Sequence, residues 1–468
     1  MASVGIVGAG IAGLVAAYYL KRRGLEVTIF EATDRVGGFM QSEQAEGFLV
    51  EYGPQTLQRT STEFEHLLRA LDLEEACIPA SPLAAHRFIV RRGQPVPLPR
   101  TPLELLRTPL LSPRARLRLL AEPFIAPADR FTEETVAAFA QRRLGAEALD
   151  YLVEPFVAGI FAGDPKHLSV RHAFPQLHRL EQRFGSLTWG AIRSLPERRY
   201  HPAPRRSMFS LVGGLGQLPQ ALAQKLQGNI VYNATVVAVR WGDKTPWTLT
   251  YRQGAHVANQ LFDVIICAAP LHQLAQLEIL PSIERHPLPK VIHPPLALVA
   301  LGFRKEQVAH PLNGFGLLVP AVERSFQILG TLFSSSIFPN RAPEGHVLLT
   351  TFVGGQRHPE LALLSEEKLE TLVRRDLERL LGISGPPVFR RVWRWERSIP
   401  QYHVGYDAVL VCLREIEVRR PGLFLAGNYR NGISVVDAAK SGLQAAQQVI
   451  FYLRQEAAGG AAKILLGE

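Results

Sequence analysis

The sequence predicts an α/β fold built from three interleaved parts. Residues 3–31 follow the order strand, glycine turn, helix, strand. Strand-like patterning returns at 207–285 and at 296–352, after a long stretch with helical spacing. Residues 423–453 again follow the order strand, glycine loop, helix. This alternation of strands and helices is typical of a parallel sheet covered by helices.

The individual elements follow from local patterns. Val4 to Val7 is a short apolar run, and residues 14–23 have helical spacing that ends before Gly24. Residues 25–30 are rich in β-formers, as are 229–239 and 262–268. Residues 365–381 place their leucines on one side of a helix, which predicts an amphipathic helix.

Composition and charge exclude several classes of protein. Of 468 residues, 47% are hydrophobic and 20% are charged, which is globular rather than disordered. The 52 Lys and Arg against 42 Asp and Glu give a net charge of +10. This excess suits a nucleic acid, an anionic membrane or a carboxylated ligand. The sequence contains no pattern typical of an RRM, a zinc finger or a helix-turn-helix, so we expect no nucleic-acid partner.

Cysteine usage and hydropathy restrict the compartment. Cys77, Cys267 and Cys412 lie far apart and form no C-x-x-C motif, which favours a reducing compartment without a disulfide framework. The first strand begins at Val4, so we expect no secretory signal. The chain has no uncharged apolar run of about 18 residues, so we expect no membrane-spanning helix. We also expect no metal site, because His167 and His172 do not have clean same-face spacing.

A glycine motif at the start of the chain predicts dinucleotide binding. It reads G-x-G-x-x-G, follows a strand and opens a helix, and its residues are Gly8, Ala9, Gly10, Ile11, Ala12 and Gly13. The glycines permit a tight turn, backbone approach to a pyrophosphate, and close packing of helix on strand. Glu31 ends the next strand, where its carboxylate can accept hydrogen bonds from a ribose.

An extension of this motif distinguishes FAD from NADP. Arg35 fits a 2′-phosphate, but the following Gly37 and Gly38 create a second place for backbone to pass close to the cofactor. The pattern E-x-x-x-R-x-G-G resembles the flavin amine-oxidase superfamily, whose members bind FAD. The resemblance implies that Phe39 packs near the cofactor. It also implies noncovalent FAD, because no cysteine follows Cys412.

The same resemblance implies further cofactor contacts. The segment Gly53, Pro54, Gln55 and Thr56 resembles the one that passes the flavin ring. In many eukaryotic members an arginine stands where this chain has Gln55, which removes one positive charge here. The remaining implied contacts are Val236 and five residues of a C-terminal glycine loop: Gly427, Asn428, Ile433, Ser434 and Val435. Asp437 is explained equally well as a residue that favours the start of the last helix.

Longer motifs in the middle of the chain resemble the protoporphyrinogen oxidase family. They are residues 154–175, residues 310–320, residues 399–402 and the triplet 86–88. That family includes oxidases of coproporphyrinogen III, and the motifs hardly separate the two activities. The resemblance implies six-electron oxidation of a porphyrinogen to a porphyrin in haem or chlorophyll synthesis. Dioxygen would accept the electrons and become hydrogen peroxide.

The family resemblance also implies a set of substrate residues. Arg87 would pair with a substrate propionate, since a guanidinium holds a carboxylate with two hydrogen bonds. Phe315 and Leu318 would sandwich the macrocycle, and Gly159 and Gly163 would let backbone approach its edge. Without the resemblance, Phe315 and Leu318 would be interpreted as core residues, Arg87 as a structural ion-pair partner, and the glycines as turn residues.

A basic, leucine-rich segment at 91–130 predicts contact with a membrane. Eight arginines stand against three acidic residues there, and the pattern predicts short amphipathic helices. Family members carry a helical membrane-binding domain in this region, so we expect a cytoplasmic protein attached peripherally to the membrane face. The resemblance also implies a homodimer.

The predicted domains are discontinuous. A Rossmann-type FAD-binding domain takes residues 1–75, 207–285 and 405–450. A helical membrane-binding domain takes 91–206. A mixed-sheet substrate-binding domain takes 76–90 and 286–404. The alternatives are another flavin enzyme, such as an amine oxidase or a carotenoid desaturase, and a basic nucleic-acid-binding protein. An amine oxidase would require an aromatic cage beside the flavin, and residues 314–316 match one poorly.

Overall fold

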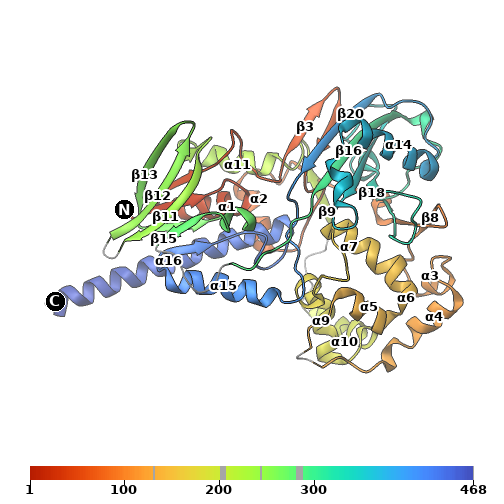
Figure 1. Cartoon of the computed structure of the whole chain (residues 1–468), viewed down its shortest axis with the longest axis horizontal. Helices are drawn as coiled ribbons and strands as arrows, with labels where there is room; N and C mark the ends of the chain where they lie inside the picture. Colours follow the sequence, from red (N-terminus) through yellow and green to blue (C-terminus); the bar gives the residue numbers. More distant parts are fainter. Residues whose placement is uncertain (130–131, 201–206, 243–244, 281–287, 467–468) are drawn as a thin grey trace.

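The computed structural model describes residues 1–468 except 130–131, 201–206, 243–244, 281–287 and 467–468. The chain forms a mixed α/β structure, as the sequence predicts. Figure 1 shows two sheet-containing regions side by side, with a group of helices packed beneath the second.

A five-stranded, all-parallel sheet forms the first region. Its order is β10-β2-β1-β14-β21. Its strands are β1 (Ser3–Val7), β2 (Glu26–Phe30), β10 (Ile230–Val231), β14 (Val264–Cys267) and β21 (Leu423–Leu425). Residues from the start, middle and end of the sequence therefore meet in one sheet. The first βαβ unit lies where the sequence predicts it.

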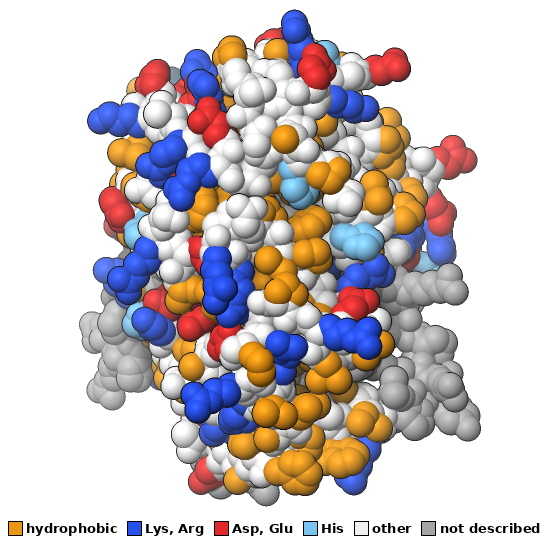
Figure 2. All heavy atoms as spheres, turned by 90° about the vertical axis from the view of Figure 1, so that its right-hand side faces the viewer, with side chains coloured by type: hydrophobic (Ala, Val, Ile, Leu, Met, Phe, Trp, Pro, Cys, Tyr) orange, Lys and Arg blue, Asp and Glu red, His pale blue; other side chains and the backbone are white. Residues whose placement is uncertain are grey.

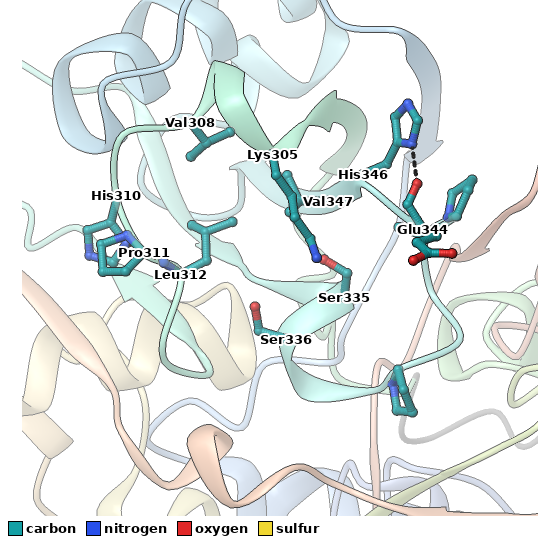
Figure 3. Close-up of a pocket in the computed structure, with 13 residues that line it drawn as sticks. Lys305, Val308, His310, Pro311, Leu312, Ser335, Ser336, Glu344, His346 and Val347 are labelled. Carbon is teal, nitrogen blue, oxygen red and sulfur yellow. Dashed lines mark hydrogen bonds between the residues drawn. The ribbon is translucent and has the colours of Figure 1, made fainter.

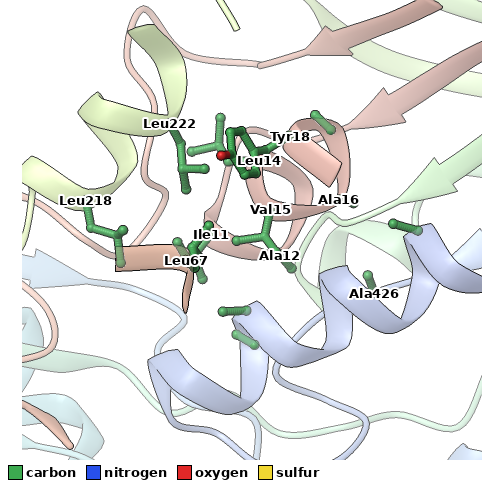
Figure 4. Packing of buried hydrophobic residues seen from close by; sticks show 14 of the residues in the cluster. Ile11, Ala12, Leu14, Val15, Ala16, Tyr18, Leu67, Leu218, Leu222 and Ala426 are labelled. Carbon is green, nitrogen blue, oxygen red and sulfur yellow. The ribbon is translucent and has the colours of Figure 1, made fainter. Parts of the chain in front are cut away.

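Helices cover this sheet and bury its core. They are α1 (Ile11–Lys21), α2 (Thr62–Ala70), α11 (Gln217–Lys225), α12 (Leu271–Leu274), α15 (Tyr406–Arg419) and α16 (Val435–Leu466). Figure 4 shows Leu14, Val15 and Tyr18 of α1 packed among side chains of neighbouring helices. Helix α16 also packs closely on α1. A Cβ at Gly442 of α16 would collide with the carbonyl oxygen of Ala12, so this approach requires a glycine. Burial of this apolar surface is the main stabilising term for the region.

A four-stranded sheet lies against the five-stranded one, in the order β13-β12-β11-β15. Its strands are β11 (Thr235–Gly242), β12 (Thr245–Gln253), β13 (His256–Phe262) and β15 (Glu278–Leu280). The ring of Phe30 lies 4.8 Å from that of Tyr251, measured between centroids, so the two sheets share an aromatic contact.

The second region is built on a seven-stranded mixed sheet, in the order β20-β16-β19-β18-β17-β7-β8. Its strands are β7 (Phe88–Arg91), β8 (Gln94–Pro97), β16 (Leu296–Arg304), β17 (Gly316–Leu318), β18 (Ile328–Leu332), β19 (His346–Gly354) and β20 (Phe389–Trp395). Helix α14 (Glu366–Leu381) covers it with Leu369, Val373 and Leu377, and Ser365 caps its first turn. This is the predicted amphipathic helix.

Two small sheets link the regions. One pairs β3 (Ser42–Ala45) with β4 (Phe48–Glu51). The other joins β5 (Leu57–Gln58), β9 (Met208–Leu211) and β6 (Cys77–Pro79). The single-turn helix α13 (Ser334–Ile337) follows β18.

Eight helices form a group below the second region (Figure 1): α3 (Pro102–Arg107), α4 (Pro113–Leu120), α5 (Val136–Leu144), α6 (Ala146–Ala148), α7 (Glu154–Phe161), α8 (Val170–Ala173), α9 (Pro175–Phe184) and α10 (Leu187–Tyr200). The fully buried Arg143 pairs here with Glu181 at 2.6 Å and with Glu122 at 3.3 Å. The Glu122 carboxylate in turn accepts the first backbone N–H groups of α10.

One part of the expected helical segment is a hairpin. Residues 88–97 form β7 and β8, and the first helix begins at Pro102. Arg92 and Gly93 take positive φ angles of 52° and 75°, which makes the tight turn between the strands. The prediction of helices from residue 91 onward was therefore wrong for the start of the arginine-rich segment, which is a strand pair. Among the helices of the described chain, none is both long and apolar enough to cross a bilayer.

Candidate cofactor and substrate site

The glycine loop lies where three parallel strands end together. β1, β14 and β21 finish at Val7, Cys267 and Leu425, which are neighbours in register. β1 connects through α1 to β2 on one side and is flanked by β14 on the other. This change of direction opens a crevice at the carboxyl edge of a parallel sheet, where such sheets bind nucleotides.

The loop leaves open backbone at the start of α1. No side chain caps the helix at Gly10, so its first N–H groups are left for a ligand. A Cβ at Gly10 would meet no protein atom within 4 Å. A Cβ at Gly13 would instead collide with the carbonyl oxygen of Gly8. Gly13 therefore serves packing, while Gly10 keeps space that a pyrophosphate fits. Ile11 and Ala12 form the first turn between them.

Glu31 lies beside this loop. Its carboxylate accepts hydrogen bonds from the backbone N–H of Ala9 at 2.8 Å and of Thr33 at 3.0 Å. Its backbone carbonyl accepts from Ala234 at 2.8 Å, which brings the start of β11, and so the half-buried Val236, to the same edge. A carboxylate has further lone pairs, so these bonds leave room for a ribose hydroxyl.

The twin glycine packs directly on the first loop. Gly37 donates its N–H to the carbonyl of Ala9 at 2.8 Å and takes a φ of 103°, where a side chain would be strained. A Cβ at Gly38 would lie 3.4 Å from Gly10 Cα. Arg35 donates to the carbonyl of Gly38 at 3.1 Å, so its guanidinium holds the turn. Both glycine motifs form one continuous backbone surface.

This surface continues to Phe39 and to the segment 53–56. A Cβ at Gly53 would collide with the Phe39 carbonyl, so Gly53 and Pro54 lie against that residue. The Phe39 ring packs on Trp395 with centroids 4.7 Å apart. Gln55 donates its side-chain amide to the carbonyls of Glu51 and Gly53, which ties down its own turn beside the half-buried Thr56.

The C-terminal glycine loop is held from both sides. Gly427 donates its N–H to Ser441 Oγ at 3.0 Å, next to the contact between α16 and Ala12. The Tyr402 hydroxyl donates to the carbonyl of Asn428, and the Tyr406 hydroxyl donates to that of Tyr429 at 2.7 Å.

Ser434 and Asp437 start the last helix. Asp437 donates its N–H to Ser434 Oγ at 3.1 Å, and the Ser434 hydroxyl donates to the Asp437 carboxylate at 2.6 Å. This places Ser434 as a helix cap between the half-buried Ile433 and Val435.

Arg87 is a half-buried cation without a carboxylate neighbour in the described chain. Its Cζ lies 5.1 Å from the centre of the Phe315 ring, and Nη2 donates to Met208 Sδ at 3.9 Å. Burial lowers the pKa of Arg87. A desolvated guanidinium that makes only cation–π and thioether contacts is costly unless a ligand supplies the anion.

Leu318 lies in β17 and faces Gly159 of α7, while Gly163 follows the end of that helix. A Cβ at Gly159 would lie 2.8 Å from Leu318 Cδ2, so helix α7 approaches β17 closely. A Cβ at Gly163 would collide with Gln401 Oε1. Phe315 packs instead with the cluster around Ala84 and Phe338. The structure thus joins Arg87 with Phe315 and Leu318 with Gly159, as two separate contacts.

Two groups of supporting residues were missed from the sequence. Glu51 is buried against Arg341 at 3.0 Å and accepts from Ser42 Oγ, which ties β4 to the segment before β19. Tyr402 and Tyr406 orient the C-terminal loop. Tyr402 lies in the motif 399–402, and Glu51 lies at the strand end just before the 53–56 segment, but the sequence assigned neither residue a role. The sequence around Arg341 does not indicate that it forms an ion pair, because its partner is 290 residues away.

Other chemistry has little support in this region. Within the described parts of the chain, no three His, Cys, Asp or Glu side chains are grouped to hold a metal ion. Cys267 is fully buried at the carboxyl end of β14, and burial raises the pKa of its thiol to about 12. A thiol held neutral in this way is a poor nucleophile.

A parallel sheet with an open glycine loop at its carboxyl edge, joined to a mixed sheet, defines a dinucleotide-binding protein. The family model described as flavin-containing amine oxidoreductase matches residues 11–450, and the chain belongs to that family. It is therefore a flavin enzyme that uses FAD, as its glycine motifs predicted. The open backbone at Gly10 and the adjoining twin glycine fit this cofactor.

Three similar proteins match nearly the whole chain and carry the names of porphyrinogen oxidases. Protoporphyrinogen oxidase 2 of Arabidopsis thaliana is 38% identical, covering 96% of this chain and 94% of its own. Coproporphyrinogen III oxidase of Bacillus subtilis is 30% identical, covering 96% of this chain and 98% of its own. A crystal structure of a candidate protoporphyrinogen oxidase from an Exiguobacterium species superposes with a TM-score of 0.81 at 26% identity, covering 97% and 99% of the two chains. These findings confirm the family that the central motifs indicated.

Proposed function

We propose that this enzyme oxidises protoporphyrinogen IX to protoporphyrin IX, with dioxygen as the electron acceptor. Six hydrogens leave the substrate in three rounds, and three dioxygen molecules become three molecules of hydrogen peroxide. Coproporphyrinogen III, which differs in its number of propionates, is the alternative substrate. The relatives carry names of both kinds, and the reaction class is the same for both.

The observation that carries this proposal is the environment of Arg87. A half-buried guanidinium beside an aromatic ring, without a carboxylate neighbour in the described chain, matches a substrate that combines an apolar ring system with carboxylates. Phe315 supplies flat contact on that side. Leu318 supplies apolar surface from the end of β17, where Gly159 lets α7 approach.

The proposed site has one set of residues for the cofactor and another for the substrate. When bound, FAD would supply the redox chemistry between the porphyrinogen and dioxygen. The Gly8–Gly13 loop and the twin glycine hold it noncovalently through backbone, with Glu31 at the ribose. Phe39, the 53–56 turn and the Gly427 loop would hold its flavin ring. Arg87 would anchor a propionate and so orient the macrocycle, and pyrrole N–H protons would leave to water.

The deciding experiment offers both substrates to the purified holoenzyme under air. Porphyrin fluorescence that grows faster with protoporphyrinogen IX, with peroxide released at three per porphyrin, is the expected result. Faster oxidation of coproporphyrinogen III would show that this is the substrate instead. A flavin-containing protein inert to both substrates would refute it.

We further propose peripheral attachment to the cytoplasmic membrane face through the helical group. Figure 2 shows hydrophobic side chains gathered with arginines and lysines on the lower part of this face, over those helices. Leu117, Leu120 and Phe124 are 68%, 57% and 85% exposed, and Arg107 and Arg114 are exposed beside them in the sequence. Large exposed apolar side chains with nearby cations suit the interface of an anionic bilayer.

A further inference from the structure

A cavity lies outside the residues assigned to the cofactor and the substrate. It has a volume of about 580 Å³, is partly open to solvent and is bounded by three segments: residues 305–312, helix α13, and the chain from 339 to the start of β19 (Figure 3). Its polar side chains are Lys305, His310, Ser335, Ser336, Glu344 and His346, and the rest of its wall is apolar. None of these residues takes part in the function proposed above.

Both histidines of the wall form a hydrogen bond with nearby backbone. Leu312 donates its N–H to His310 Nδ1 at 3.0 Å, so the ring proton is on Nε2, which remains a donor. Desolvation lowers the pKa of His310 and keeps the ring neutral. His346 is used locally, since Nδ1 donates to the Glu344 carbonyl at 2.9 Å.

The hydroxyls and the lysine add donors that the protein leaves unused. Ser335 Oγ accepts the N–H of Leu348 at 3.0 Å, so its own hydrogen is left to donate. Ser336 Oγ is half-buried and Lys305 Nζ is exposed to solvent, and neither has a hydrogen-bond or ion-pair partner among the residues that the structure describes. Figure 3 shows the Lys305 side chain extending across the cavity toward Ser335. One ammonium and two hydroxyls therefore converge on one space.

The position of Lys305, rather than the charge balance of the wall, favours an anion of small size. Lys305 and Glu344 both line the cavity and both are exposed to solvent, which screens each charge alike. It is the Lys305 ammonium that extends to the serine hydroxyls (Figure 3). Charge-assisted hydrogen bonds from an ammonium are stronger than neutral ones, and hydroxyl donors complete the shell of an oxyanion.

We propose that this cavity binds the phosphate or carboxylate group of a small soluble molecule, with Lys305, Ser335 and Ser336 as its donors. The site is separate from the candidate substrate site but shares helix α13 with it. Ser335 and Ser336 line the cavity, while Ile337 and Phe338 pack in the cluster that contains Phe315. An occupant would thus touch the element that supports Phe315.

Calorimetric titration of the FAD-loaded protein with inorganic phosphate tests the proposal. We expect saturable binding at one site per chain, at least about ten-fold weaker in Lys305→Ala, as for the loss of a charged hydrogen bond. Ser336→Ala should weaken binding by a smaller factor. Lys368→Ala removes an exposed lysine of α14 and is the matched control, with unchanged binding expected.

Three results would overturn the proposal. The first is the absence of saturable binding by both phosphate and succinate, which carries carboxylates. The second is binding that Lys305→Ala leaves unchanged while the variant keeps its flavin spectrum. The third is Lys305-dependent sedimentation with phosphatidic acid vesicles in the absence of phosphate binding, which would assign the surface to a lipid headgroup instead.

Discussion

The guanidinium of Arg87 lies over the ring of Phe315, with 5.1 Å between Cζ and the ring centre. The two residues are 228 positions apart in the sequence (315 − 87) and meet because β7 and β17 pair in the seven-stranded sheet. This contact joins the cation and the flat apolar surface that we propose as the binding site of a carboxylated macrocycle.

Replacement of Arg87 should therefore weaken substrate binding selectively. Arg87→Ala is expected to raise the KM for the porphyrinogen by about 10- to 100-fold, the value of a desolvated charged hydrogen bond. Arg87→Lys should recover part of this loss. Initial rates at varied substrate concentration measure the effect, and Arg414→Ala, an exposed change on α15, is the control. An unchanged KM would remove Arg87 from the site.

The two glycines at the start of α1 should respond differently to alanine. Gly10→Ala meets no protein atom, so the apoprotein should keep its melting temperature while FAD content falls strongly. Gly13→Ala collides with Gly8, so it should lower the melting temperature of the apoprotein as well. Flavin absorbance and calorimetry separate the two outcomes. Gly10→Ala protein with a full complement of FAD would contradict this assignment.

The helical group should be sensitive to acid through Glu181. Burial raises the pKa of this carboxyl, but hydrogen bonds from Arg142 and Arg143 outweigh burial, and the pKa lies below its ordinary 4.5. A lowered pKa in the folded state stabilises the protein above the ordinary pKa, and this stability is lost as pH falls through the lowered value. Unfolding should therefore become easier below about pH 4.5.

Glu181→Gln isolates this contribution. It leaves the buried Arg143 with one carboxylate, Glu122, and should cost about 3 kcal/mol at neutral pH. It should also flatten the dependence of stability on pH in the acid range. Denaturant unfolding measured at several pH values checks both effects, with the exposed Glu306→Gln as control. Equal acid sensitivity of Glu181→Gln and wild-type protein would count against the ion pair as its source.

Membrane attachment should depend on the exposed leucines of α4. Leu117→Glu combined with Leu120→Glu places two negative charges on the surface that we propose for the bilayer. Co-sedimentation with vesicles containing anionic lipid should fall at least about five-fold, because apolar burial is lost and repulsion is added. Val257→Glu, at a position 64% exposed on β13, is the matched control. Undiminished sedimentation of the double variant would place the contact elsewhere.

Local patterns were sufficient for much of the cofactor region. The βαβ unit, both glycine motifs and the last helix all lie within short stretches, and their geometry depends on backbone φ angles and on spacing that neighbouring residues set. Gly37 at a φ of 103° and Gly13 against the Gly8 carbonyl occupy positions where only glycine fits without strain. The motifs could therefore be read without the rest of the chain.

The substrate side depended on the tertiary structure. Arg87 and Phe315 are joined by a strand pairing, and Glu51 and Arg341 by burial between β4 and a distant segment. Neither pairing has a period or a spacing in the sequence. The same reason explains the β7–β8 hairpin inside an arginine-rich segment, because pairing with β17 decides its conformation.

Short-range geometry determined the cofactor-binding motifs from the sequence, since each glycine motif carries its own steric requirement. Long-range packing decided which cation is left without a carboxylate in the described chain, which ring it faces, and which helix face is exposed. Those properties depend on burial and on partners hundreds of residues away, and local sequence does not encode them.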